Sequence, residues 1–303
     1  MTPSPDTPAT EPAPSPAEPL RLQVLTALAL HRMATTGQLR LMLRPGSPRQ
    51  LISRVLNTLR TTGHTDRTVL PHPGRPRTHA WYLTPHGARL TRDLPALRGR
   101  PPYPITSTTA ASLKTAHTLT VVRTHLTFAQ DARLHGHEHG PYDWTPETAH
   151  PIGEGERLVA DALMHYTLVG HQQRTKLRAF IEVDRTTMSS ERLATKLIDY
   201  ARLFHHEAQP PGRRRPTTTG PAWLRWYPLF PRILFILTAA SRPRLEGRIS
   251  DLQAMAAQHP LAATLANEVP LAAAILEDLE QHSPTAPVWT PLTGGNPRAW
   301  TEL

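Results

Sequence analysis

The spacing of apolar residues predicts three helices near the start of the chain. Apolar side chains recur at helical intervals over residues 20–33, and shorter stretches with the same periodicity follow at 35–43 and 47–63. The apolar positions of the first helix are Leu22, Leu25, Ala29 and Met33. We therefore expect a small helical group directly after the first 19 residues.

Residues that favour the first and last positions of helices occur at the ends of these segments. Thr35 or Thr36 is expected to cap the second helix, because a threonine hydroxyl accepts a hydrogen bond from the first turn. The third helix is expected to have Ser47 as its N-cap and Pro48 at its first helical position. Gly63 is expected to end that helix.

The third helix has two contrasting faces. Its expected buried stripe consists of Leu51, Ile52, Val55, Leu56 and Leu59. Its expected outward face consists of Arg49, Gln50, Ser53, Arg54 and Asn57. A helix that reads the major groove of DNA needs such a pairing of a buried anchor with outward hydrogen-bond donors.

A hairpin and a further helix follow. Strands are expected over 66–70 and 78–84, and the turn between them contains Arg75 and Arg77. A helix over 84–94 closes this part of the chain.

Together these elements resemble a winged helix-turn-helix domain that covers residues 20–93. The resemblance implies DNA binding, with the third helix in the major groove and the two turn arginines on the backbone or in the minor groove. Helices of this kind also serve as protein interaction modules, so this alternative stays open.

A proline-rich linker over 94–109 separates this domain from a second one, expected over 110–290 with a tail at 291–303. A long helix is expected over 112–135. His117 lies within it and is interpreted as structural. The loop after it holds His135, His137, Glu138 and His139. A dedicated zinc site is disfavoured there, because no matching ligand pair occurs elsewhere.

Two strand-like segments, 157–169 and 175–187, carry acidic residues inside apolar runs. Because side chains alternate along a strand, Glu182 and Asp184 share one face with Phe180. If the two strands are neighbours, Asp161 lies beside Glu182.

A helix with Ser189 or Ser190 as its N-cap follows directly. Lys196 and Tyr200 are four residues apart on it, so they lie one above the other. A buried strand, 232–240, and another helix come later, and the chain ends with a helix and a short extended segment.

This order of elements resembles the PD-(D/E)XK nuclease superfamily, and the chain over 20–290 resembles the replication-relaxation family of plasmids and mobile elements. The likeness rests on "VADAL", "FIEVDRTT" and "KLIDY". It implies an α+β (α/β) chain in which a winged helix-turn-helix domain precedes a restriction-endonuclease-like αβββαβ domain.

The resemblance also implies that Asp161 and Glu182 hold a divalent metal, Mg²⁺ with Mn²⁺ as a substitute. In the pattern of this superfamily, a lysine two residues after the second acid assists the attacking water. Asp184 occupies that position in this chain. One explanation is that Lys196 has taken the role of this lysine, since Lys196 and Tyr200 are similar to a glutamine-to-tyrosine motif of exonuclease-like members. The other is that the domain is a degenerate nuclease fold.

Repulsion between carboxylates favours a metal at this site, whichever family the chain resembles. Asp161, Glu182 and Asp184 within a few ångströms would repel one another, and a divalent cation would relieve that repulsion. The opposing interpretation is that Asp184 pairs with Arg185 or Arg178 and that the other two acids have purely structural roles.

Composition narrows the class of protein. The chain has 303 residues, a net charge of +10 and no cysteine, and the charge favours a polyanionic partner. The first 19 residues lack the features of a secretory signal, and no apolar run is long enough for a transmembrane helix. We expect a cytoplasmic location and no membrane partner. Arg213, Arg214 and Arg215 form either a phosphate-gripping loop or a solvated insertion.

These features predict a DNA-binding protein of plasmid or mobile-element replication or relaxation, with double-stranded DNA as its partner and a Mg²⁺-dependent nickase or nuclease activity. A homodimer, or replication and mobilisation proteins as partners, would be compatible with this role. The alternative is a non-catalytic replication accessory protein or transcriptional repressor that retains a degenerate nuclease fold.

Overall fold

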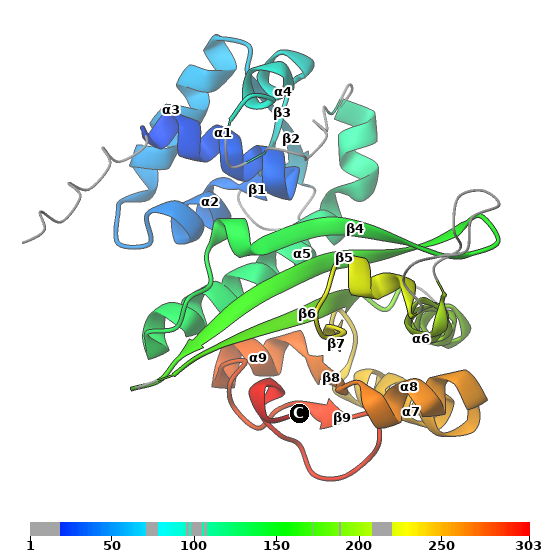
Figure 1. Cartoon of the computed structure of the whole chain (residues 1–303). Coiled ribbons are helices and arrows are strands. Elements are labelled where there is room, and N and C mark those ends of the chain that lie inside the picture. Colours follow the sequence, from blue (N-terminus) through cyan, green and yellow to red (C-terminus); the bar gives the residue numbers. More distant parts are fainter. Residues whose placement is uncertain are drawn as a thin grey trace, which may run out of the picture.

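The computed structural model is a mixed α+β protein and describes residues 19–70, 78–94, 97, 105, 108–171, 173–187, 189–207 and 220–303, with side chains of the long helix from residue 115. N-terminal helices with a small three-stranded sheet lie beside a larger, six-stranded sheet with helices (Figure 1). Within the described residues, no helix is both long and apolar enough to cross a membrane.

The N-terminal part follows the predicted order of helices and hairpin, with one added strand. Its elements are α1 (Leu20–His31), β1 (Met33–Thr35), α2 (Thr36–Leu43), α3 (Arg49–Thr61), β2 (Thr65–Leu70), β3 (Thr78–Leu83) and α4 (Pro85–Thr91). The antiparallel strands are ordered β1-β3-β2. The short β1, which includes Met33, was expected to be helical; it instead pairs with Tyr82 on β3.

Local capping accounts for where these helices begin. Thr35 caps α2 as predicted, because its hydroxyl oxygen accepts the Gln38 amide N–H. The Gln38 side-chain oxygen accepts the Thr35 amide N–H in turn, which completes a capping box. The prediction for α3 is wrong by one residue. Pro48 is the N-cap and the helix begins at Arg49, without a side-chain cap from Ser47. Gly63 follows the helix with a φ of 75°, a left-handed conformation that glycine tolerates.

The remaining elements build the larger sheet and its two helical layers. They are α5 (Thr108–His135), η2 (Pro141–Asp143), β4 (Trp144–Gly153), β5 (Glu156–Val169), β6 (Arg174–Asp184), α6 (Ser190–His205), η3 (Ala222–Arg225), β7 (Arg232–Leu237), α7 (Arg242–Gln258), α8 (Pro260–Glu268), β8 (Leu271–Ile275), α9 (Leu276–His282), β9 (Thr290–Pro291) and η4 (Trp300–Glu302). Their strand order is β4-β5-β6-β7-β8-β9. Strands β6, β7 and β8 are parallel, and the other pairs are antiparallel.

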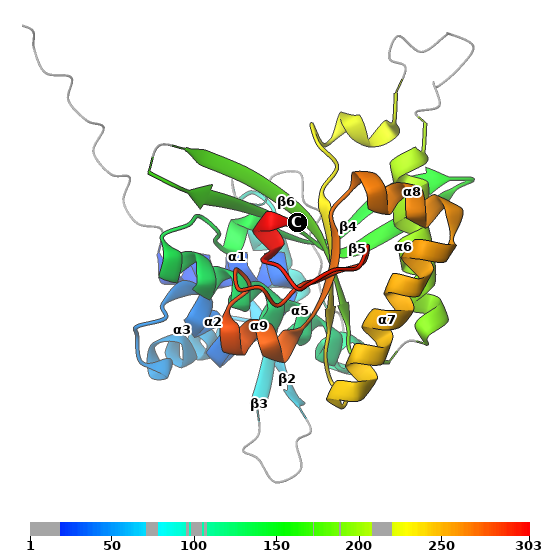
Figure 2. The same ribbon diagram turned by 90° about the horizontal axis from the view of Figure 1, so that it is seen from below.

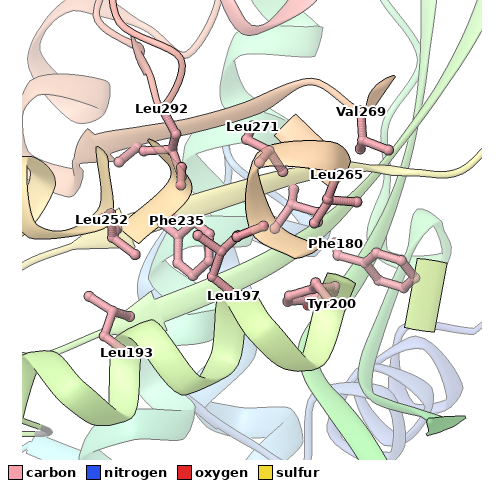
Figure 3. Packing of buried hydrophobic residues seen from close by; sticks show 14 of the residues in the cluster. Phe180, Leu193, Leu197, Tyr200, Phe235, Leu252, Leu265, Val269, Leu271 and Leu292 are labelled. Atoms are coloured by element: carbon pink, nitrogen blue, oxygen red, sulfur yellow. The ribbon is translucent and has the colours of Figure 1, made fainter. Parts of the chain in front are cut away.

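Each face of the sheet has its own apolar core. On one face, α6, α7 and α8 pack against β6, β7 and β8, with Phe180, Leu197, Tyr200 and Phe235 among the buried residues (Figure 3). On the other face, α5, α9 and the C-terminal segment bury Ile181, Trp289 and Trp300 among others. The central strands are therefore largely apolar on both sides, as is typical of parallel strands between two helical layers, and the buried acids Glu182 and Asp184 of β6 are exceptions.

The segment 271–275 corrects the predicted C-terminal helix. Leu271, Ala273 and Ile275 face one core while Ala272 and Ala274 face the other, so the segment is a strand buried on both faces. Its alanine-rich sequence looks helical in isolation, but parallel pairing with β7 decides its structure. The predicted helix begins only at Leu276.

Helix α5 joins the two parts. Its residues Val122 and Leu126 belong to the same core as α1, α2 and α3. The Arg133 guanidinium donates to the carbonyls of Leu41 and Met42 at the end of α2, at 2.8 and 2.7 Å. Helix α5 thus helps to set the position of the N-terminal helices, together with β4, whose Glu147 pairs with Arg32.

Three buried histidines lie at this junction. His31 at the end of α1 stacks on His125 of α5 with ring centroids 4.7 Å apart, and His125 meets the edge of His139 at 5.1 Å. Burial lowers the pKa of His139 to about 4, and burial together with the neighbouring histidines lowers the pKa of His125 well below its usual value. Both rings are therefore neutral in the folded protein at neutral pH.

We predict that acid destabilises the fold through these histidines. In the folded protein, His139 stays neutral until the pH falls to its pKa of about 4, whereas in the unfolded chain it protonates near pH 6.5. Its contribution to stability is therefore lost as the pH falls from 6.5 towards 4. The full contribution is roughly 3 kcal/mol. Thermal unfolding of His139→Gln from pH 7.5 to 4.5 should show a shallower loss than the wild type. His205→Gln, an exposed control, should keep the wild-type slope, and an unchanged slope for His139→Gln would contradict the assignment.

Candidate functional site

Strand β5 changes the face of its side chains at Asp161. Leu158 and Ala160 belong to the core under α6, whereas Ala162 and Met164 belong to the core under α5. Glu147 of β4 lies opposite Asp161, between the pairs Pro146–Ala162 and Thr148–Ala160, but the two residues are not themselves a register pair. Glu147 has a φ of 49°, in the left-handed region that non-glycine residues seldom adopt. This local reversal places Asp161 at a break in the ladder.

The break brings Asp161 beside Glu182, as the sequence predicted for neighbouring strands. The last ladder pair of β5 and β6 joins Ala162 to Ile181, so the next pair outward would join Asp161 and Glu182. The Val183 amide N–H donates to the Asp161 carboxylate at 2.8 Å and not to a backbone carbonyl of β5. Asp161 therefore takes the place of a backbone acceptor where the two strands separate.

Glu182 is buried and its carboxyl is held from α6. The Tyr200 hydroxyl donates to Oε1 of Glu182 at 2.6 Å, and the Lys196 ammonium lies 3.2 Å from the same oxygen. Lys196 also donates to the Val159 carbonyl of β5. Lys196 and Tyr200 thus reach one carboxyl from successive turns of the helix, as their spacing predicted, and Figure 3 shows Tyr200 within the apolar cluster.

The surroundings of Glu182 favour its protonated form. Burial and the nearby Asp161 charge raise the pKa of Glu182 to about 8, although Lys196 and Tyr200 act in the opposite direction. Burial and the Glu182 carboxyl also raise the pKa of Tyr200 well above its usual value, so its hydroxyl remains a donor. A carboxyl with such a pKa costs stability when it ionises and would gain from a nearby cation.

His117 of α5 is a member of this site that the sequence interpretation missed. Its Nε2 lies 2.9 Å from Oδ1 of Asp161, the oxygen that Val183 does not use. This hydrogen bond raises the pKa of His117 above its usual value, against the effect of burial. The two residues are 44 positions apart, so no local pattern could have linked them.

Asp184 does not join the other two acids, and the predicted cluster of three carboxylates is wrong. Its Oδ2 forms a buried ion pair with Arg248 of α7 at 2.6 Å, and its Oδ1 accepts the Thr186 amide at 2.9 Å. The predicted partners Arg178 and Arg185 are also wrong. Within the described ranges, no three histidine, aspartate or glutamate side chains are placed to hold one metal ion.

The outward face of α3 is largely as predicted, with two differences. Arg49, Gln50, Arg54 and Asn57 are exposed, while Ser53 is half-buried. Leu51 was expected in the buried stripe but is 38% exposed, whereas Ile52, Leu56 and Leu59 are buried and the partly buried Val55 packs against the same core. Arg75 and Arg77, and also Arg213, Arg214 and Arg215, lie outside the described residues.

The histidine-rich loop packs against β5. The Val169 amide donates to His137 at 3.2 Å, and His139 donates to the His165 carbonyl at 2.7 Å. Glu138 forms a two-way backbone bridge with Thr167. These bonds give the loop a structural role in extending the sheet edge.

Residues 25–215 match the Replication-relaxation family. The chain belongs to this family. The match covers the N-terminal helices, Asp161, Glu182, Lys196 and Tyr200. Membership suggests a role related to plasmid replication and carries no catalytic detail. No curated protein and no solved structure is significantly similar to the chain.

We predict that Glu182→Gln stabilises this replication-relaxation protein above pH 6. Folded Glu182 retains its proton up to a pKa of about 8, whereas the unfolded residue loses it near 4.5, so wild-type stability falls as pH rises between these values. Glutamine keeps an oxygen for the Tyr200 hydroxyl and has no proton to lose. At pH 7.5 the gain in unfolding free energy should be roughly 2–4 kcal/mol.

Urea unfolding at pH 5, 6 and 7.5 measures this effect. Glu191→Gln, at an exposed position on the first turn of α6, is the matched control and should leave the pH profile unchanged. A loss of stability in Glu182→Gln at pH 7.5 would mean that the ionised carboxylate is the native form.

Proposed function

We propose that this protein binds double-stranded DNA during replication of a plasmid or mobile element and cuts one strand of it at a metal-assisted site. The observation that carries the proposal is the meeting of Asp161, Glu182 and Lys196 where β5 and β6 separate. Two acids and a cation at one point of a sheet are suited to phosphodiester chemistry, where a metal and a positive charge stabilise the developing negative charge.

The arrangement of elements supports a nuclease-like second domain. Helix α5 is followed by the antiparallel strands β4, β5 and β6, then by α6 and the parallel strand β7. This is the αβββαβ order implied by the resemblance to PD-(D/E)XK nucleases. Asp161 lies on the second of the three strands and Glu182 on the third, as in that motif.

The chemistry of the two carboxylates suits a hard divalent cation. Mg²⁺ is commonly held by one or two protein carboxylates, with waters and substrate phosphates as the other ligands. Burial and, after it, the Asp161 charge raise the pKa of Glu182, and a nearby cation would favour the ionised carboxylate against both effects. Mg²⁺, or Mn²⁺ in its place, would supply Lewis-acid polarisation of the scissile phosphate and a more acidic bound water.

Each residue of the site has a distinct role in this proposal. Asp161 and Glu182 would bind the metal, and His117 holds Oδ1 of Asp161. Lys196 places a positive charge beside Glu182 and is the candidate substitute for the motif lysine. Tyr200 orients the Glu182 carboxyl through its hydroxyl and is a positioning residue.

The N-terminal part supports DNA recognition by a winged helix. Helix α3 exposes two arginines, Arg49 and Arg54, that form no ion pair with any described residue, and its opposite side is anchored in the core. An anchored helix with free cationic and amide groups is suited to the major groove.

Asp184 favours a second candidate function. The position that holds lysine in active PD-(D/E)XK enzymes holds an acid here, and that acid is neutralised by Arg248. A protein that has exchanged its motif lysine for a structural ion pair could serve as a non-catalytic replication accessory protein or repressor. Cleavage assays separate the two functions.

The expected activity is Mg²⁺- or Mn²⁺-dependent nicking of supercoiled plasmid DNA. Asp161→Asn and Glu182→Gln should abolish nicking, and so should Lys196→Ala if Lys196 replaces the motif lysine. Glu191→Gln is the control with normal activity. Absence of cleavage on supercoiled, linear and single-stranded DNA, with duplex binding retained, would favour the non-catalytic alternative.

Metal binding gives a readout that does not depend on cleavage. Wild-type melting temperature should rise with Mg²⁺, since a ligand present at 100 times its Kd stabilises the folded state by about 2.7 kcal/mol. Asp161→Asn and Glu182→Gln should lose this increment, while Lys196→Ala should keep it. An equal increment in all variants would place the bound metal elsewhere.

DNA binding is tested on α3. Arg49→Ala combined with Arg54→Ala should weaken duplex binding and lower the slope of log K against log salt by about 1.8, because each lost phosphate contact contributes about 0.9. Arg89→Ala combined with Arg92→Ala removes the same charge from exposed positions around α4 and is the control. Gel-shift titrations at several salt concentrations measure both. Equal weakening in the control would indicate a general charge effect rather than contact by α3.

A further inference from the structure

Strands β5 and β6 continue beyond β4 and β7 as a two-stranded ribbon, which has the isolated Glu138–Thr167 bridge at its β5 edge. Strand β4 pairs with β5 only as far as Met164, and β7 pairs with β6 only from Ala179. The pairs between His165 and Arg178 and between Val169 and Arg174 lie past both neighbours. Figure 2 shows this hairpin projecting from the body of the protein.

The two faces of the ribbon differ in character. Tyr166 and Leu177 are paired on one face and buried, and the Tyr166 ring meets Trp300 edge-on at 5.2 Å. The other face carries His165, Thr167 and Val169 from β5, opposite Arg178, Lys176 and Arg174 from β6. One face is thus fixed to the core, and the other presents cationic side chains from alternate positions of one strand.

Two of these cations form no ion pair within the part of the chain that the structure describes. Arg174 forms an ion pair with Glu138 of the histidine-rich loop, but Lys176 and Arg178 form none with any described residue. Residues 165–178 contain no aspartate or glutamate. The face therefore keeps net positive charge, which an external anion can neutralise.

The geometry of the ribbon restricts the kind of anion. Alternate residues on a strand are about 6.6 Å apart, so Arg178 and Lys176 form a regular row and not a single pocket. A two-stranded ribbon also has the dimensions of the DNA major groove. An extended polyanion with regularly spaced charges fits such a row better than an isolated phosphate does.

We propose that the exposed face of the β5–β6 ribbon is a second contact for the phosphate backbone of duplex DNA, separate from α3. The inference rests on the proposed DNA binding but not on cleavage. Arg178 is four residues before Glu182 on the same face of β6. DNA held by the ribbon is thereby kept within about 13 Å, measured along the strand, of the acid pair.

The test compares the full-length wild type with Lys176→Ala combined with Arg178→Ala, by fluorescence anisotropy on a labelled duplex at several salt concentrations. The double variant should bind roughly ten- to sixtyfold more weakly at 0.1 M salt and show a slope smaller by about 1.8. Lys176→Arg combined with Arg178→Lys should restore both values, because the charge is retained. The Arg89/Arg92 double variant should behave as wild type.

The outcomes distinguish this inference from the proposed function. If the wild type fails to bind duplex DNA, the proposed function itself fails. If the wild type binds and the Arg49/Arg54 variant is weakened but the ribbon variant is not, only the ribbon contact is overturned. Loss of binding to phosphatidylserine vesicles in the ribbon variant, with DNA binding unchanged, would assign this face to a membrane surface and would also overturn the proposal.

Discussion

The pairing of β6 with β5 on one side and β7 on the other is the constraint on which the larger part of the structure depends. Antiparallel pairing with β5 and parallel pairing with β7 place β6 inside the sheet, with a helical layer over each face. Every side chain in its second half must then be apolar or be satisfied by a partner. Ala179, Ile181 and Val183 meet this demand on the α5 side, whereas the other side carries two acids.

The two acids meet the demand in different ways. Asp184 has a full counter-charge in Arg248 and a backbone donor in Thr186, which makes it a buried ion pair with little left to offer a ligand. Glu182 has only Tyr200 and a shared Lys196, beside the charge of Asp161, and its pKa rises to about 8. Ionisation of the Glu182 carboxyl therefore costs stability in the folded protein.

Residues near one another in sequence could be predicted well, and those joined by folding could not. Periodicity sufficed for α1, α3, β5, β6 and α6, and for the shared reach of Lys196 and Tyr200. It did not indicate β8, whose alanines favour a helix until β7 pairs with them. His117 and Arg248 escaped prediction for the same reason, since each meets its acid across the sheet from a distant helix. The break at Asp161, with Glu147 in a left-handed conformation, likewise exists only once β4 and β5 pair.

Helix α5 connects the two sites on which the proposed function rests. In its first half His117 is hydrogen-bonded to Asp161, and near its end Arg133 donates to the final carbonyls of α2. Between them, the Gln38 side chain of α2 donates to the Leu119 carbonyl at 2.9 Å, and His31 of α1 stacks on His125. The helix that would read DNA belongs to the same core as α1 and α2. Packing on α5 therefore constrains where α3 lies relative to the acid pair, and with it where DNA bound as proposed would lie.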